Sequence, residues 1–193
     1  MDTTVGLRER KKAETRQAVH EATLRLAVEF GLDNVTVEAI ADAANISRRT
    51  FSNYFDSKED ALLYGDERRL GELVRHVRDQ PAGQSAWQAL RAAMKCLYDE
   101  NGIPDREWLI RTKLAKRHPS LLARQLANHV RLENELTQAL AGRAAGGIPA
   151  EVITAAFLAG LRVATQLWIA DGETRNLQEV TDQVLDQIAQ PFG

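Results

Sequence analysis

A cluster of polar side chains near residue 50 offers the clearest recognition chemistry in the sequence. Guanidinium, hydroxyl and amide groups follow one another there without an acid: Arg48, Arg49, Thr50, Ser52 and Asn53. These groups donate hydrogen bonds to phosphate oxygens and to the edges of nucleic-acid bases. A helix that presented them on one face would therefore offer a surface for DNA.

The residues before this cluster predict a short helix. Val37, Ile40, Ala41 and Ala44 recur at intervals of three and four, so they share one helix face. Ala41 and Ala44 are small and would let a second helix cross closely.

A turn and a second short helix are predicted to follow. Asn45 tolerates a left-handed backbone better than most residues, and Ser47 is a favourable N-cap. The helix over residues 48–54 would bury Phe51 and Phe55 and expose the polar cluster. Helix, turn and helix together form a device that lays its second helix in a DNA groove.

The block from Thr36 to Leu62 resembles the TetR family of bacterial transcriptional regulators. Its apolar, turn and capping positions match in register without a gap: Thr36, Ile40, Ala41, Ala44, Ile46, Ser47, Thr50, Tyr54, Phe55, Ser57, Lys58 and Glu59. Asn45, Arg49 and Ser52 replace a glycine, a small residue and an aromatic that are usual in the family. Because of these three replacements, the resemblance does not fix the contacts around Ser52 or the operator sequence.

The resemblance implies which residues contact DNA. Phosphates would be held by Thr36, Tyr54 and Lys58. Base edges or nearby phosphates would be contacted by Arg48, Arg49, Thr50 and Asn53. Ser47 and Ser52 complete the expected set.

The overall charge gives no support for binding an anionic polymer. The 193 residues carry a net charge of −2, and residues 1–56 hold eight Lys or Arg against nine Asp or Glu. Attraction to phosphate must therefore be local. Besides the two arginines at 48 and 49, a basic cluster near the N-terminus qualifies: Arg8, Arg10, Lys11, Lys12 and Arg16. A solvated tail is the alternative interpretation of that cluster.

Cysteine content and hydropathy favour a reducing cytoplasm, and the resemblance implies that it is a bacterial one. Cys96 is alone, so no intramolecular disulfide can form, and no signal peptide is evident. The apolar region over residues 152–170 is interrupted by Arg162 and three other polar residues, so we expect no membrane span.

Helical periodicity extends through the remaining chain and predicts an all-α fold of about nine helices. A three-helix DNA-binding module over residues 1–56 would be joined by a long helix to a helical ligand-binding and dimerisation domain over residues 57–193. The expected helices cover residues 8–30, 58–79, 85–99 and 105–118, then start at Pro119, Pro149 and Asn176. Gly146 and Gly147 would end the helix that starts at Pro119.

The helix that starts at Pro149 is apolar on every face, which predicts burial on every face. The resemblance implies a homodimer interface made by this helix and the last one: Ala155, Leu158, Ala159, Arg162, Val180, Val184 and Ile188. A fully buried central helix of a monomer is the alternative.

Large side chains on the C-terminal helices form either a solid core or the walls of a cavity. The resemblance favours an effector pocket lined by Trp87, Met94, Leu97, Trp108, Leu114, Leu126, Phe157, Leu161 and Trp168. The effector would be small and apolar or amphipathic. Basic residues at 111, 113, 116, 117 and 124 form either a solvated face or a site for an anionic head group. The Ser47–Asp60 block resembles family members thought to sense fatty-acyl thioesters, which favours the head group.

Other constellations carry little chemistry. His129 and Glu133 have the i,i+4 spacing of two metal ligands but also of ordinary surface residues. The sequence contains no Ser-His-Asp signature, phosphate-binding glycine loop or paired Cys motif. We therefore expect no catalytic residue, metal or cofactor, and we expect that the chain is not an enzyme.

Three hypotheses remain. The first is a ligand-responsive, homodimeric regulator that acts as a repressor at a pseudo-palindromic operator. The second is a constitutive DNA-binding protein without an effector. The third is a small helical enzyme or interaction module whose helix-turn-helix is structural.

Overall fold

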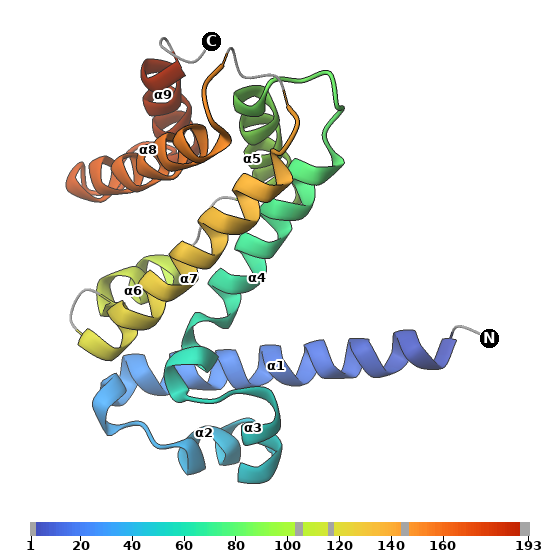
Figure 1. The fold of residues 1–193 in the computed structure, drawn as a ribbon. Coiled ribbons are helices and arrows are strands. Elements are labelled where there is room, and N and C mark those ends of the chain that lie inside the picture. The colour runs from blue at the N-terminus through green and yellow to red at the C-terminus, as the bar shows by residue number, and fades with distance from the viewer. Residues whose placement is uncertain (1–2, 103–105, 116–117, 144–146, 190–193) are drawn as a thin grey trace. The chain divides into compact units, whose positions relative to one another are not determined.

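The computed structural model describes residues 3–102, 106–115, 118–143 and 147–189. Within these ranges it contains helices and no strand, so the predicted all-α class is confirmed (Figure 1). The helices are α1 (Thr3–Phe30), α2 (Val37–Ala43), α3 (Arg48–Tyr54), α4 (Lys58–Asp79), α5 (Ala86–Asn101), α6 (Arg106–Ala115), α7 (Pro119–Ala139), α8 (Ala150–Ala170) and α9 (Leu177–Ala189), with a 3-10 turn η1 (Leu32–Asn34).

The chain forms two compact units. The first comprises Met1–Arg68 with Asp105–Ala127, and the second comprises Arg69–Pro104 with Asn128–Gly193. Helices α4 and α7 therefore contribute residues to both units. The division into residues 1–56 and 57–193 stays a prediction.

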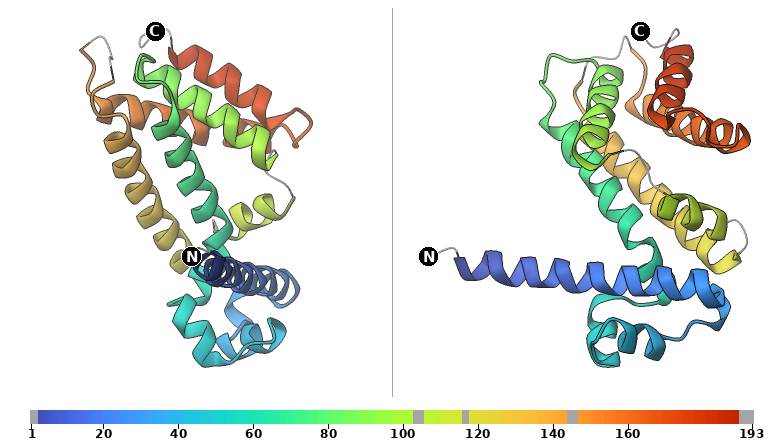
Figure 2. Two further views of the ribbon diagram at one scale, coloured as in Figure 1. Left: turned by 90° about the vertical axis from the view of Figure 1, so that its right-hand side faces the viewer. Right: turned by 180° about the vertical axis from the view of Figure 1, so that it is seen from behind.

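In the first unit, α2 and α3 pack against one side of α1 (Figure 2). Their shared core contains Val19 of α1, Ile40 of α2 and Phe51 of α3. A neighbouring cluster joins Leu24 of α1 to Leu62 of α4, with further leucines from η1 and the start of α7. These two cores fix the orientation of the short helices, which could not be stable alone.

The turn between α2 and α3 has the expected local structure. Asn45 adopts φ 53°, in the left-handed region, and the Ile46 amide donates to the Ala41 carbonyl at 2.9 Å. Thr36 caps α2 by accepting from the Ala39 amide, and Ser47 caps α3. The sequence prediction of this turn is confirmed.

In the second unit, α8 and α9 form a close helix pair. A Cβ placed on Gly160 of α8 would lie 2.8 Å from Leu185 Cδ2 and 3.0 Å from Ile188 Cδ1 of α9. Helix α5 packs on the same core through Trp87, whose ring meets that of Phe157 edge-to-face at 6.1 Å.

The end of α7 differs from the prediction. The helix ends at Ala139 rather than continuing to Gly146, which lies outside the described residues. Gly142 adopts φ 79°, and the Arg143 side chain donates to three carbonyls at the end of α4: those of Val77, Gln80 and Pro81. The gain from satisfying these terminal carbonyls explains why the chain leaves the helix early.

Helix α8 is long and apolar enough to cross a membrane by length and composition alone. Its buried residues include Ile153 and Phe157, which pack in the core of the second unit. Val152 and Leu167 of the same helix are 47% and 48% exposed, so within one chain α8 is not buried on every face as predicted. Packing in this unit therefore accounts for only part of its apolar composition.

Candidate nucleic-acid interface

Helix α3 presents four of the five predicted donors on its outer side, whereas Thr50, also predicted to be exposed, is half-buried. Arg48, Arg49, Ser52 and Asn53 are exposed, whereas Phe51 is only 1% exposed. The aromatic residue anchors the helix in the core and leaves the polar side chains in solvent. The arrangement suits insertion of one helix face into a DNA groove.

Hydroxyl groups at the helix starts are used within the module. Ser47 Oγ accepts from the Thr50 amide at 3.0 Å and lies 2.8 Å from Thr50 Oγ1, and Thr50 is half-buried. Thr36 Oγ1 accepts from the Ala39 amide at 3.1 Å. These contacts set the position of α2 and α3, an N-cap contribution of about 0.5–2 kcal/mol each.

An acid reaches the exposed face from the neighbouring helix. Glu38 Oε1 of α2 lies 2.8 Å from Arg48 Nη1 of α3, and both side chains are largely exposed. The pair joins two helices, so the residues of α3 alone do not reveal it. Arg48 is consequently paired in the absence of DNA.

Lys58 is bonded inside the module rather than pointing freely outward. Its Nζ donates to the Leu32 carbonyl at 2.7 Å and to the Val35 carbonyl at 3.0 Å. Two of the three ammonium donors therefore tie the η1 turn to the start of α4. The predicted phosphate contact of Lys58 stays a prediction, with one donor available to serve it.

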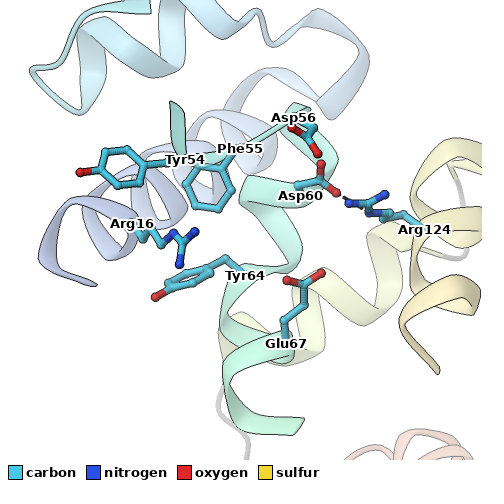
Figure 3. A pocket seen from close by; sticks show the side chains of 8 residues that line it. All are labelled: Arg16, Tyr54, Phe55, Asp56, Asp60, Tyr64, Glu67 and Arg124. Carbon is cyan, nitrogen blue, oxygen red and sulfur yellow. Dashed lines mark ion pairs between the residues drawn. The ribbon is translucent and has the colours of Figure 1, made fainter. Parts of the chain in front are cut away.

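Tyr54, at the end of α3, stacks with an arginine from α1. Arg16 Cζ lies 5.8 Å from the Tyr54 ring centroid and 5.9 Å from that of Tyr64, and Figure 3 shows the guanidinium between the two rings. Cation–π contacts of this kind favour a fixed guanidinium position. They connect α1, α3 and α4 on one side of the module.

A polar cleft of about 170 Å³ opens beside this stack. At its rim, Arg124 Nε of α7 lies 2.5 Å from the buried Asp60 Oδ1 of α4 (Figure 3). Small-molecule sites commonly measure about 300–1,000 Å³, so the cleft is small for one. The Asp60–Arg124 pair instead holds the first turn of α4 against α7.

Comparison with known proteins identifies the family. Residues 20–64 match the sequence model described as bacterial regulatory proteins of the tetR family, and residues 84–193 match that of the MftR C-terminal domain. The chain belongs to the TetR family of transcriptional regulators. It is 28% identical over 195 residues to the transcriptional regulator TcmR of Streptomyces glaucescens, covering 95% of this chain and 86% of TcmR.

Solved structures of TetR-family proteins share the fold. The FadR repressor of Thermus thermophilus in complex with lauroyl-CoA has a TM-score of 0.60 at 23% identity, covering 91% of this chain and 93% of that one. The FadR regulator of Bacillus subtilis in complex with stearoyl-CoA has a TM-score of 0.59 at 18% identity, covering 92% and 99%. Because the chain belongs to the TetR family of transcriptional regulators, it is a transcriptional regulator and not an enzyme.

The residues predicted to line an effector pocket fall in both units. Trp87, Leu97 and Phe157 are buried in one core of the second unit, with Met94 and Leu161 packed against it. Trp168 is also buried in this unit, and its indole donates to the Arg175 carbonyl at 2.8 Å.

The other three predicted pocket residues belong to the first unit. Trp108 and Leu114 are half-buried there, and Leu126 is 63% exposed. The pocket assignment therefore stays a prediction. Among the described residues no group of three His, Cys, Asp or Glu side chains could hold a metal ion.

The residues predicted for the dimer interface differ in their exposure within one chain. Ala155 and Arg162 are exposed, and Ala159 and Ile188 are half-buried. Leu158, Val180 and Val184 are 5%, 2% and 8% exposed, because α8 and α9 bury them in their own unit. These three offer little area to a partner subunit, and the interface stays a prediction.

Proposed function

We propose that this TetR-family protein is a ligand-responsive repressor of the bacterial cytoplasm. It binds a pseudo-palindromic operator as a homodimer and is released by a small apolar or amphipathic effector. The observation that carries the DNA-binding part is the capped, core-anchored helix α3 with Arg49, Ser52 and Asn53 exposed together. Two such helices would read half-sites about one helical turn apart, roughly 34–36 Å.

Selection from a pool of random duplexes tests this proposal. The purified protein is expected to enrich a motif with two inverted half-sites spaced by about one turn or a multiple of it. The control is a variant with Arg49, Ser52 and Asn53 replaced by alanine, which keeps the fold because all three are exposed. A wild-type protein that enriches no motif would contradict the proposal.

An exposed apolar strip on α8 supports dimerisation. Val152 is 47% exposed, Leu167 is 48% exposed, and Ala155 and Ala159 lie between them along the helix. Water contact with such a strip is unfavourable by about 25 cal/mol per Å², so a second copy would cover it. Ala159→Glu would place an unpaired charge there, and Gln178→Glu on α9 adds the same charge as a control. Sedimentation should show a wild-type dimer and a more weakly associating Ala159→Glu variant, whereas a wild-type monomer at micromolar concentration refutes the homodimer.

The effector class rests on the chemistry of the bundle and on the relatives. The second unit has a large apolar core that includes Trp87, Leu97 and Phe157, and two FadR relatives were solved with lauroyl-CoA and stearoyl-CoA. We therefore propose an acyl-thioester-like effector with an apolar chain and an anionic head group. The effector can release the operator only if it binds the conformation that does not bind DNA more tightly than the conformation that does.

Long-chain acyl-CoA is the probe for this part, and coenzyme A without an acyl chain is its control. The acyl thioester is expected to change tryptophan fluorescence and to weaken operator binding. By linkage, bound operator must weaken acyl-CoA binding by the same factor. If neither acyl-CoA nor other amphipathic anions change operator affinity, the protein is a constitutive DNA-binding protein.

A further inference from the structure

The first turns of α1 extend beyond the rest of the DNA-binding module. In Figures 1 and 2, α1 continues well past α2 and α3 toward its N-terminal end. Every residue from 6 to 14 is exposed, whereas Val19 is 0% exposed. A helix end that projects free of its own domain is available to a partner.

The projecting turns continue the helix face that packs on α2 and α3. One line of residues runs along that face at intervals of four and three: Arg8, Lys12, Thr15, Val19, Ala22 and Leu26. Val19 and Leu26 belong to the core formed with Ile40 of α2 and Phe51 of α3. Arg8 and Lys12 therefore lie on the side of α1 that carries the recognition helix.

Charge is unevenly distributed around the projecting turns. Lys11 follows Arg8 by three residues, at helical spacing, so it lies at the edge of the same side and gives three cations there. Arg10 points to the opposite side, where its Nε lies 3.6 Å from Glu14 Oε1. Glu9 is the one acid between residues 6 and 14 outside that pair. The side that carries α3 is thus basic although the whole chain has a net charge of −2.

Arg16 connects this basic stripe to the end of the recognition helix. Its guanidinium stacks on Tyr54 of α3, and it follows Lys12 by one helical turn. Arg8 lies about 12 Å farther along the helix axis from Arg16, at about 1.5 Å per residue. The stripe can therefore reach DNA that α3 itself does not touch.

We propose that Arg8 and Lys12, with Lys11 beside them, bind DNA phosphates outside the groove segment read by α3. The inference rests on the proposed DNA binding and adds a second, sequence-independent contact surface. Phosphate is the fitting occupant because the stripe combines exposed cations with few acids, and it lies on the DNA-reading side of the helix. Such contacts strengthen binding to every sequence and carry no base preference.

The test compares two double variants that remove the same charge from the same helix. Arg8→Gln with Lys12→Gln removes the stripe, whereas Arg10→Gln with Arg25→Gln removes two exposed arginines from other sides of α1. Affinity for the selected operator and for an unrelated duplex is measured over a range of salt concentrations. Circular dichroism checks that both variants keep the helix content of the wild type.

The stripe variant should bind both duplexes more weakly and should select the same operator motif as the wild type. The slope of log K against log salt should become shallower by about 1.8, from about 0.9 for each of two lost phosphate contacts. The control variant should keep a slope close to that of the wild type.

Equal slopes for the wild type and the stripe variant would refute this inference, as would equal losses in the two variants. Either result leaves operator selection by the wild type intact, so the proposed function would stand. A wild-type protein that binds no duplex would refute the proposed function, and this inference with it.

Discussion

At the scale of single residues, the cationic side chains of the reading module have different tasks. Lys58 is bonded to the carbonyls of Leu32 and Val35, and Arg48 is paired with Glu38. Arg49 is exposed and stands beside Ser52 and Asn53 on the same helix. Arg49 is therefore the strongest candidate for reading a base, because guanine offers two acceptors to one guanidinium.

Replacing Lys58 by methionine separates its structural role from its predicted phosphate contact. Lys58→Met keeps the apolar stem but removes the ammonium donor from the carbonyls of Leu32 and Val35, of which the Leu32 carbonyl still accepts from the Val35 amide at 3.2 Å. The free energy of unfolding is expected to fall by about 1–3 kcal/mol in denaturant titrations. Unchanged stability together with a flatter salt dependence of DNA binding would show that Lys58 acts on phosphate instead.

Removing the charge of Glu38 should strengthen DNA binding. Glu38→Gln frees Arg48 and takes an anion away from the DNA-facing side, so affinity should rise for every sequence. The log K against log salt slope should steepen by up to about 0.9, one phosphate contact. In an Arg48→Ala background the same change should have a smaller effect. An equal gain in DNA affinity in both backgrounds would show that the Glu38–Arg48 ion pair is not the cause of the gain.

At the scale of elements, the features that depend on residues close together in sequence could be predicted. The capped turn at Asn45 and the burial of Phe51 follow from residue type and spacing, and both are confirmed. The early end of α7 does not follow, because Arg143 caps carbonyls of α4 more than sixty residues away in sequence. The Glu38–Arg48 pair was missed for the same reason: it joins two helices.

Substitutions at two helical glycines should change the stability of the protein in opposite directions, because Gly160 lies at the close crossing of α8 and α9 and Gly71 does not. Gly160→Leu must displace Leu185 and Ile188 and should cost about 1–3 kcal/mol of unfolding free energy. Gly71→Ala in α4 meets nothing within 4 Å and should stabilise the protein by about 0.4–1 kcal/mol. Thermal unfolding of both variants measures the difference. A neutral Gly160→Leu variant would contradict the crossing.

The contact between α5 and α9 should give the protein an alkaline sensitivity. Burial raises the pKa of Tyr98, whose hydroxyl lies 3.3 Å from Thr181 Oγ1. The unfolded chain releases this proton near pH 10 while the folded chain keeps it, so stability falls as pH rises above about 10. Tyr98→Phe should lose less stability than the wild type between pH 9 and pH 11. An identical loss of stability in Tyr98→Phe and the wild type would show that Tyr98 does not cause the alkaline sensitivity.

At the scale of the whole molecule, the family and the fold agree with the prediction from the sequence. The homodimer, the repressor role and the effector are proposals. The class of regulator could be predicted because the turn, caps and core positions of the reading module lie in one continuous block. The effector pocket could not, because its predicted residues come from helices far apart in sequence and from both units. Helices α4 and α7 each contribute residues to both units, so each helix continues from the unit that contains α3 into the unit that contains α8 and α9.

The most direct test of the central claim, that α3 reads bases, is a double-mutant cycle between Arg49 and the operator. Affinities of the wild type and of Arg49→Ala are measured for the selected operator and for operators with single base-pair changes. At one position the wild type should lose about 1–3 kcal/mol on base change, and Arg49→Ala should lose almost nothing there. If Arg49→Ala weakens binding equally for every operator, with no coupling at any base pair, Arg49 does not read a base and the account of α3 is contradicted.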